Sequence, residues 1–243
     1  MIMTQWNQAV RRLLRVVGFE VHRRAIRNAS DLQLNAILRL AQVDTVVDVG
    51  ANAGQFGVSL RAAGYRGRII SFEPLRAAHA RLARRSKADP AWTVPERAAL
   101  GERDGEVEIH VSANSYSSSV LPMLARHTSA APDSKVVGTE RVPLRRLDSV
   151  LPGTVDPGSS VFLKIDTQGY EDRVLAGARE TLKSIRGLQL ELSLVGLYQG
   201  QVLFLEMVKL LDEAGFGLYA LNPEFVDPVT GQTLQVNGVF LRR

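Results

Sequence analysis

Short apolar runs alternate with longer amphipathic segments from Thr45 onward, and this alternation limits the fold more than any other feature of the sequence. Runs of strand length occupy residues 45–49, 67–73, 160–166 and 188–194. Segments with helical spacing follow them at 55–64, 74–86, 170–185 and 202–215. Strands that alternate with helices of this length pair in parallel. We therefore predict an α/β fold with a doubly wound, mostly parallel sheet.

The end of the chain departs from this alternation, because strands at 216–222 and 233–243 follow one another without a helix. They predict an antiparallel pair at one edge of the sheet. Residues 92–100 and 106–112 predict two further strands. Residues 113–139 are rich in Ser, Ala and Pro and predict a long surface segment.

Two helices are predicted before the first strand, at 6–17 and 31–41, because apolar residues recur there at helical spacing. We expect residues 1–42 to form an N-terminal helical extension. Residues 43–243 are then the Rossmann-like domain.

The stretch VVDVGANAGQF, residues 46–56, is a strand, a tight turn and the start of a helix. In open α/β sheets such a turn is the usual cofactor loop. A dinucleotide fingerprint needs a second glycine where this chain has Asn52, so NAD and FAD are disfavoured. The sequence also lacks the glycine-lysine loop of NTPases. The turn therefore favours a cofactor without phosphate.

S-adenosylmethionine is such a cofactor, and the charged residues of this region suit it. Amide groups of the turn can take its carboxylate. Asp48, inside the apolar run, can take its ammonium group or hold the amides of the turn. Glu73 ends the second strand and can accept the ribose hydroxyls, although the same arrangement also serves NAD. The alternative for both residues is that they only cap turns.

With these motifs in place, the chain resembles the FkbM family of S-adenosylmethionine-dependent methyltransferases over roughly residues 43–225. The resemblance rests on VVDVGANAGQF, ISFEP, AAL, NSYSSS, LDSV and LKIDTQGYE, in this order. It implies a class I methyltransferase fold and O-methylation of a sugar or polyketide hydroxyl. Within the family, the basic N-terminus and KIDTQGYE are similar to mycobacterial enzymes that methylate deoxysugars, such as fucosyl or rhamnosyl units, of cell-envelope glycolipids.

The resemblance also implies where the cofactor binds. The methionine side falls to the turn, the ribose to Glu73, and the adenine to backbone groups after the third strand. The implied cofactor-binding residues are Asp48, Gly50, Asn52, Gly54, Phe56, Glu73, Pro74, Ala98, Ala99 and Asp166.

Methyl transfer to a hydroxyl needs a base, because an alcohol is about as weak an acid as water, with a pKa of roughly 15.7. Asp166, at the end of the predicted strand 160–166, is the first candidate for this base, and Glu191 is the second. His127 is a further catalytic candidate, whose alternative is an ordinary loop residue. We expect no metal, because Gln168 stands where many family members carry an acidic residue.

Substrate contacts are expected from Ser117, Ser118, Ser119, Gln168 and Glu171. The serine hydroxyls have an alternative role in bonding their own loop. Glu171 is also a candidate base, or else a carboxylate favoured by its place in the first turn of a helix. The acceptor pocket is expected mainly from residues 1–40 and 113–139.

The net charge of +5 raises two alternative functions, because basic residues cluster at 11–15 and 22–27. One is a nucleic-acid methyltransferase, which the 6% aromatic content disfavours. The other is a protein that binds a membrane surface or a partner through residues 6–27. There is no cysteine, no apolar run of about 20 residues and no secretory pattern. We expect a cytoplasmic protein, peripheral at most to the inner face of the membrane, with a small-molecule or glycolipid substrate.

Overall fold

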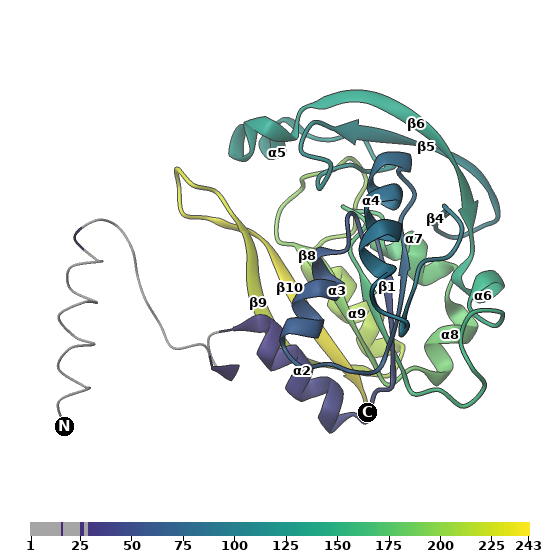
Figure 1. Cartoon of the computed structure of the whole chain (residues 1–243). Helices are drawn as coiled ribbons and strands as arrows, with labels where there is room; N and C mark the ends of the chain where they lie inside the picture. Colours follow the sequence, from purple (N-terminus) through teal and green to yellow (C-terminus); the bar gives the residue numbers. More distant parts are fainter. Residues whose placement is uncertain (1–15, 17–24, 27–28) are drawn as a thin grey trace.

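The computed structural model describes residues 16, 25–26 and 29–243 (Figure 1). Its main sheet has seven strands in the order β3-β2-β1-β7-β8-β10-β9. Only β10 runs against the other six. The strands are β1 (Thr45–Val49), β2 (Arg68–Phe72), β3 (Trp92–Thr93), β7 (Val161–Ile165), β8 (Gly187–Ser193), β9 (Phe216–Val226) and β10 (Thr233–Arg242). The predicted fold and the antiparallel pair at one edge are confirmed.

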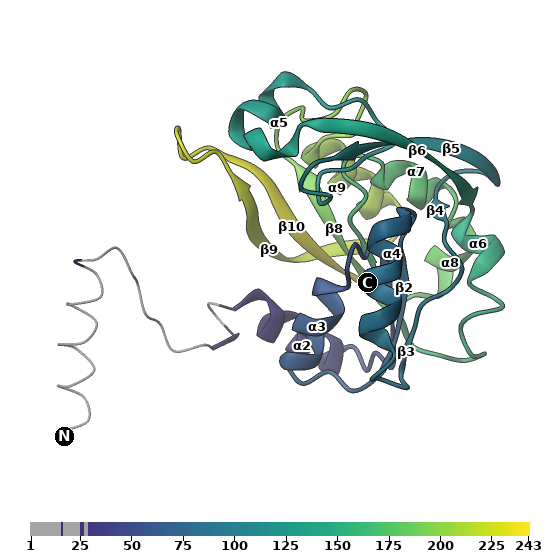
Figure 2. The same ribbon diagram turned by 45° about the horizontal axis from the view of Figure 1, so that its top comes forward.

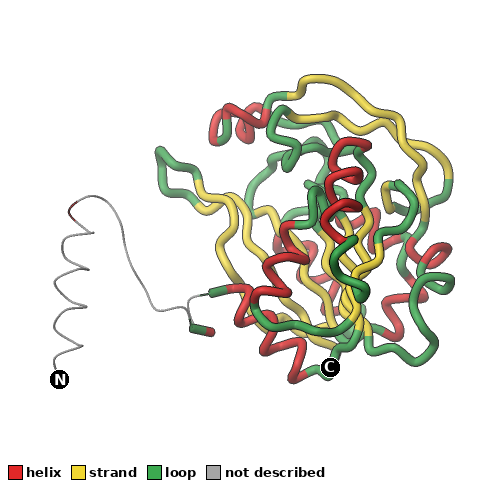
Figure 3. Tube along the Cα trace, in the orientation of Figure 1, coloured by secondary structure: helices red, strands yellow, loops and turns green. Residues whose placement is uncertain are grey.

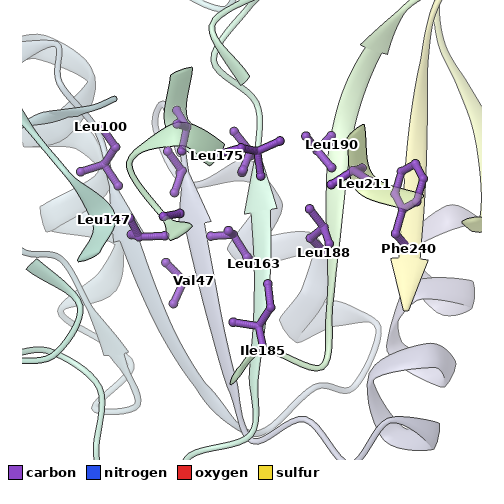
Figure 4. Close-up of a cluster of buried hydrophobic side chains, with 14 of the residues drawn as sticks. Val47, Leu100, Leu147, Leu163, Leu175, Ile185, Leu188, Leu190, Leu211 and Phe240 are labelled. Atoms are coloured by element: carbon purple, nitrogen blue, oxygen red, sulfur yellow. The ribbon is translucent and has the colours of Figure 1, made fainter. Parts of the chain in front are cut away.

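Helices cover both faces of this sheet, as the red and yellow segments of Figure 3 show. One face packs against α2 (Ser30–Leu40), α3 (Gln55–Ala62) and α4 (Arg76–Ser86), through residues such as Leu38, Leu60 and Leu82. The other face packs against α6 (Leu147–Val150), α7 (Glu171–Ala176), α8 (Arg179–Ser184) and α9 (Phe204–Glu213). Figure 4 shows this second core around Leu163 and Leu188.

Successive residues of β1 point to opposite faces of the sheet, as they do in any strand. Val47 and Val49 enter the core beside α6 and α7, whereas Val46 enters the core beside α2 and α3. Asp48 has the same parity as Val46. Its side chain therefore belongs to the face that α2 and α3 cover.

A second sheet arches over one end of the first (Figures 1 and 2). It contains β4 (Ala99–Leu100), β5 (Gly105–Ser112) and β6 (Val136–Arg145), in the order β4-β6-β5. The predicted strand 92–100 is thus wrong as one unit. It divides around Pro95, which has no amide hydrogen for a ladder bond, and its two halves join different sheets.

Two other predicted segments are also corrected. Residues 170–185 form two helices, because the chain bends at Gly177, where a Cβ atom would overlap the carbonyl of Gly101. Residues 113–139 are not only surface loop. They contain α5 (Ala125–Ala130), a 3-10 turn, η2 (Pro132–Ser134), and the start of β6.

The predicted helix 31–41 is present as α2, and its Leu34, Ile37 and Leu38 pack into the core of the main sheet. Apart from Val16, the predicted helix 6–17 lies outside the described residues, as do the basic side chains of both N-terminal clusters. The division into residues 1–42 and 43–243 stays a prediction. Within the described part of the chain, no helix is both long and apolar enough to cross a bilayer.

Candidate active site

The turn between β1 and α3 is a strained loop whose amides are already bonded. Gly50, Asn52 and Gly54 have φ values of 77°, 47° and 86°. Gly50 and Ala51 donate to the carbonyl of Phe72. The amides of residues 52–54 also bond within the protein, to Glu73, to the Asn52 side chain and to the Ala51 carbonyl. Capture of a ligand carboxylate by these amides would therefore have to displace one of these bonds.

A side chain is excluded at Gly50 and at Gly54 for different structural reasons. A Cβ atom at Gly50 would overlap the carbonyl oxygen of Asp166, so this glycine lets the turn touch the end of β7. At Gly54 a Cβ atom would press on Leu82 and Trp92. Gly54 therefore serves packing, and it lines neither of the pockets described next.

Two pockets meet at this turn, and Gly50, Asn52 and Asp166 line both. The smaller one, here called the apolar pocket, has a volume of about 60 Å³. Its wall includes the predicted residues Glu73, Pro74, Ala98, Ala99, Ser118 and Ser119. The larger one, here called the polar pocket, has a volume of about 320 Å³. Phe56 lines it, together with residues of α2, β8, β9 and β10.

Glu73 places a carboxylate on the wall of the apolar pocket. It accepts one hydrogen bond from the Asn52 amide and one from the Leu75 amide, each at 2.8 Å. Its neighbours in the wall include Leu100 and Ile109. Burial raises the pKa of Glu73 to about 7, against the effect of the two amides. Because each carboxylate oxygen can accept more than one hydrogen bond, Glu73 can still bind hydroxyl groups of a ligand.

Asp48 does not reach either pocket. It is fully buried, and its carboxylate is 3.1 Å from the ammonium of Lys164 on the neighbouring strand β7. Ser71 donates to its other oxygen at 3.2 Å. Lys164 also donates to the carbonyl of Gly50 at 3.4 Å. Asp48 thus acts on the turn through Lys164. Its side chain has no exposed surface in this arrangement, and its predicted contact with the cofactor stays a prediction.

Lys164, which was not among the predicted site residues, lines the polar pocket. Its ammonium is 3.3 Å from Asp166 and 5.3 Å from the centre of the Phe56 ring. Burial lowers the pKa of Lys164, but the charges of Asp166 and Asp48 outweigh burial and raise it. Lys164 is therefore a permanent cation beneath the turn. Its signal in the sequence was a charge inside the apolar run VFLKI.

Asp166 is held by donors on both carboxylate oxygens. Lys164 lies at Oδ2, and the Gln168 amide donates to Oδ1 at 2.9 Å. The same Gln168 nitrogen donates to Glu191 at 2.6 Å, and Tyr198 donates to the Gln168 oxygen at 2.8 Å. Gln168 has a φ of 57°, in the left-handed region that non-glycine residues rarely adopt. Its predicted substrate contact stays a prediction; its observed contacts position Asp166.

Glu191 lies behind Gln168 and lines neither pocket. One of its oxygens accepts hydrogen bonds from both Gln168 and Gln235. Burial, followed by the charge of Asp166, raises the pKa of Glu191 well above its ordinary value. In this arrangement Glu191 supports Gln168, while its predicted role as a base stays a prediction.

Glu171 and His127 also lie away from the pocket walls. The Glu171 carboxylate accepts hydrogen bonds from the amides of Thr167 and Gly169 and so closes the turn after β7. His127 is buried in α5, 3.0 Å from the Ser134 hydroxyl, and its ring packs on Tyr198 and Phe225. Burial lowers the pKa of His127. The observed contacts of both residues are with the protein itself, and their predicted contacts with reactants stay predictions.

The predicted serines are bonded within the protein. Ser118 accepts a hydrogen bond from the Ser112 amide, and Ser119 donates to the Gln168 carbonyl. Ser117 bonds the Asn114 side chain and lines neither pocket. The loop therefore satisfies its own polar groups, as the alternative interpretation held, while Ser118 and Ser119 also face the apolar pocket.

The same loop closes over the turn between β1 and α3. Asn52 donates to the Ser115 hydroxyl at 3.2 Å, and Gln55 donates to the Tyr116 hydroxyl at 2.8 Å. Tyr116 lines the polar pocket. Among the described residues, no group of three or more His, Asp or Glu side chains is placed to hold a metal ion.

Comparison with known proteins agrees with this geometry. The chain matches the family model described as "Methyltransferase FkbM domain" over residues 48–218, which is more than half of its length. No curated protein matches it.

Solved structures similar to the chain include methyltransferases from several bacteria. The match to a putative O-methyltransferase from Klebsiella pneumoniae has 12% identity and a TM-score of 0.50, and covers 97% of this chain and 89% of that one. The match to methyltransferase FkbM from Methylobacillus flagellatus KT has 18% identity and a TM-score of 0.47, and covers 82% and 43%. The match to magnesium protoporphyrin IX methyltransferase from Synechocystis PCC 6803, solved with bound SAM, has 10% identity and a TM-score of 0.46, and covers 97% and 96%.

The chain spans less than half the length of the Methylobacillus protein. The Klebsiella structure, at this level of identity, supports the class I methyltransferase fold. The family model spans the turn at Gly50, Glu73 and Asp166. On this evidence, the chain belongs to the FkbM methyltransferase family.

Proposed function

We propose that this protein is an S-adenosylmethionine-dependent O-methyltransferase that acts on a sugar hydroxyl. The observation that carries the proposal is the position of Asp166. Its side chain is 36% exposed and lines both pockets at the point where they meet. A group at this point can contact a cofactor in one pocket and an acceptor in the other.

The residues of the apolar pocket fit the nucleoside half of S-adenosylmethionine. Pro74, Ala98 and Leu100 offer an apolar wall for adenine, and Glu73 offers oxygens for the ribose hydroxyls. Gly50 and Asn52 would hold the methionine half where the pockets join. When bound, the cofactor supplies a methyl group on a sulfonium, which is already activated for transfer.

Asp166 is our candidate for the base. An acceptor hydroxyl must lose its proton as the new bond to carbon forms, and a carboxylate within hydrogen-bond reach can take it. Lys164 and Gln168 fix the direction of the carboxylate, since each binds a different oxygen. Holding the base and the acceptor in fixed positions accounts for much of the rate gain in such reactions.

The finer proposal concerns the acceptor. The sequence resemblance supports a sugar hydroxyl, and a deoxysugar of a cell-envelope glycolipid is its narrowest form. Attachment to the inner membrane face through residues 6–27 would then bring the enzyme to its substrate. A nucleic-acid acceptor has no specific observation in its favour among the described residues.

Calorimetry and a transfer assay test the proposal in turn. S-adenosylmethionine and S-adenosylhomocysteine should bind the purified protein with micromolar affinity, one molecule per chain. Incubation with methyl-labelled cofactor and candidate glycolipids should then yield a labelled product, whose methylated position is located by NMR. A protein that binds neither cofactor form would refute the proposed function. Label transferred only to nitrogen or carbon would refute its O-methyltransferase part.

A further inference from the structure

One wall of the polar pocket is built outside the part of the chain that matches the family model. That model ends at residue 218 and begins at residue 48. Gln33 comes from α2, Asn222 and Glu224 come from β9, and Asn237 comes from β10, and all four line the pocket. Figure 1 shows β9 and β10 as a long hairpin at the edge of the molecule, beside α2. The family match therefore does not define what this wall binds.

Several side-chain amides line this pocket, and some of their polar groups have no hydrogen-bond partner among the described residues. Asn222 donates to the Gln33 oxygen at 3.0 Å, and Asn237 donates to Glu224 at 2.7 Å. These bonds leave the Gln33 amino group and the Asn222 oxygen for a ligand. Gln189 lines the pocket from β8, and its side chain has no hydrogen bond among the described residues. An amide offers both donors and an acceptor, which match the two functions of a hydroxyl group.

The charges of the wall select against an anion. Its acidic side chains include Asp166 and Glu224, whereas Lys164 is its one cation among the described residues. Lys164 is already paired with Asp48 and Asp166. An anionic ligand would thus meet these two carboxylates, with no free cation in the described part of this wall to pair with. Phe56 adds an aromatic face, which suits the apolar side of a ring.

We infer that the polar pocket is the acceptor site and that it takes an uncharged ring carrying several hydroxyl groups. In this assignment Gln189 and Asn222 bind ring hydroxyls, and Glu224 excludes acidic sugars. This inference rests on the proposed function, because Asp166 must present the reacting hydroxyl to the cofactor. It differs from the expectation that the pocket comes mainly from residues 1–40 and 113–139, since four strands of the main sheet supply part of the wall.

Saturation-transfer NMR on the full chain, with S-adenosylhomocysteine present, tests the assignment. The probes are methyl β-D-glucopyranoside, methyl α-L-rhamnopyranoside and methyl α-L-fucopyranoside, and methyl β-D-glucuronide is the acidic counterpart of the first. We expect at least one neutral glycoside to bind. The glucuronide should bind about tenfold more weakly than the glucoside, and this ratio of dissociation constants corresponds to a small difference in binding free energy. Glu224→Gln should narrow that ratio.

Three variants separate this site from the rest of the surface. Gln189→Ala and Asn222→Ala should each weaken the neutral glycoside about tenfold, the loss expected for a hydrogen bond of ordinary strength. Gln232→Ala is the matched control, because Gln232 is exposed near the tip of the same hairpin. It should bind as the parent protein does. If Asn222→Ala fails to fold after losing its bond to Gln33, Gln189→Ala still decides, since the Gln189 side chain makes no hydrogen bond within the described part of the chain.

Several outcomes would overturn the assignment. They are binding of no neutral glycoside, equal binding of glucoside and glucuronide, or unchanged affinity in the Gln189→Ala protein. Calorimetry of S-adenosylhomocysteine in the same samples distinguishes failure of the acceptor-site assignment from failure of the proposed function. Intact cofactor binding with any of these outcomes rejects the acceptor site alone, whereas absent cofactor binding rejects the proposed function itself.

Discussion

Asp48 and Lys164 lie opposite each other on the neighbouring parallel strands β1 and β7, and their charged groups are 3.1 Å apart in the interior of the protein. The row continues on both sides, since Ser71 is in register with Asp48 and Gln189 is in register with Lys164. Trp92 donates to Ser71, which donates to Asp48. A polar line thus crosses four strands of an otherwise apolar sheet and reaches the polar pocket.

Removal of the cation from this line should destabilise the fold strongly. Lys164→Met leaves Asp48 buried without its partner, and breaking one side of a buried ion pair costs about 3–5 kcal/mol. The free energy of unfolding, measured with urea, should fall by this amount. The double variant Asp48→Leu with Lys164→Met should recover most of the loss, because no buried charge is then left unpaired.

Lys183→Met is the control for this experiment. Lys183 pairs with Glu180 on the surface, where both side chains are 70% exposed. Its loss should cost less than about 1 kcal/mol. A Lys164→Met protein as stable as this control would contradict the pairing.

The turn at Gly50 should not tolerate a side chain. Gly50→Ala adds strain of about 1–3 kcal/mol at a left-handed φ, and its methyl group would also overlap the Asp166 carbonyl. We expect a lower melting temperature and at least tenfold weaker cofactor binding. Gly138→Ala in β6, where a methyl group meets nothing within 4 Å, should be as stable as the parent or slightly more so.

Cofactor affinity should depend on pH through Glu73. Because burial raises its pKa to about 7, the carboxyl of the free protein is mostly protonated below that pH. Ribose hydroxyls donate to the ionised form, so affinity should rise with pH up to about 7 and then level off. Calorimetry at several pH values measures this slope, which Glu73→Gln should abolish while lowering affinity overall. An unchanged slope in the variant would assign the pH dependence to another group.

Loss of the candidate base should affect turnover and spare cofactor binding. Asp166→Asn is expected to cut kcat by about 10²–10⁴-fold, the usual contribution of a general base. Its cofactor affinity should stay within a few-fold of the parent value. Asp156→Asn, at an exposed surface aspartate, is the control and should keep full activity. Turnover that survives in Asp166→Asn would exclude Asp166 as the base.

Stability should decrease as the pH rises between 4.5 and about 7, through Glu171. Burial raises the pKa of Glu171 to about 7 from its ordinary value of 4.5, so in this range the folded protein binds more protons than the unfolded chain. The free energy of unfolding then falls with rising pH. Glu171→Gln should flatten this part of the pH profile in urea titrations. A profile unchanged in the variant would show that Glu171 ionises normally.

The regions predicted best from sequence were those where local pattern and tertiary structure agree. The run around Val47, the turn at Gly50 and the strand before Glu73 were found because each strand leads directly into a turn and a helix. The sequence also indicated Asp166, since the end of a parallel strand is where such folds present polar groups.

The features that the sequence did not reveal depend on contacts between segments that are distant in the sequence. Lys164 was treated as part of an apolar strand, because its pairing with Asp48 depends on the register of two strands far apart in the sequence. The sequence around His127 gives no sign that its ring packs on Tyr198 and Phe225. Glu171 could be a base or a helix-end carboxylate on pattern alone, and only the amides of Thr167 and Gly169 decide its contacts.

The proposed binding of the methyl donor and the proposed recognition of the acceptor fall to different segments of the chain, and the hairpin of β9 and β10 belongs to the second. In the proposed function, the segment from Gly50 to Asp166 would bind the methyl donor, whereas the hairpin and α2 hold side chains that would recognise the molecule to be modified. On this proposal, sequence drift in the hairpin would change the preferred substrate and leave donor use intact. Exchange of this hairpin between relatives would then give enzymes with new acceptors.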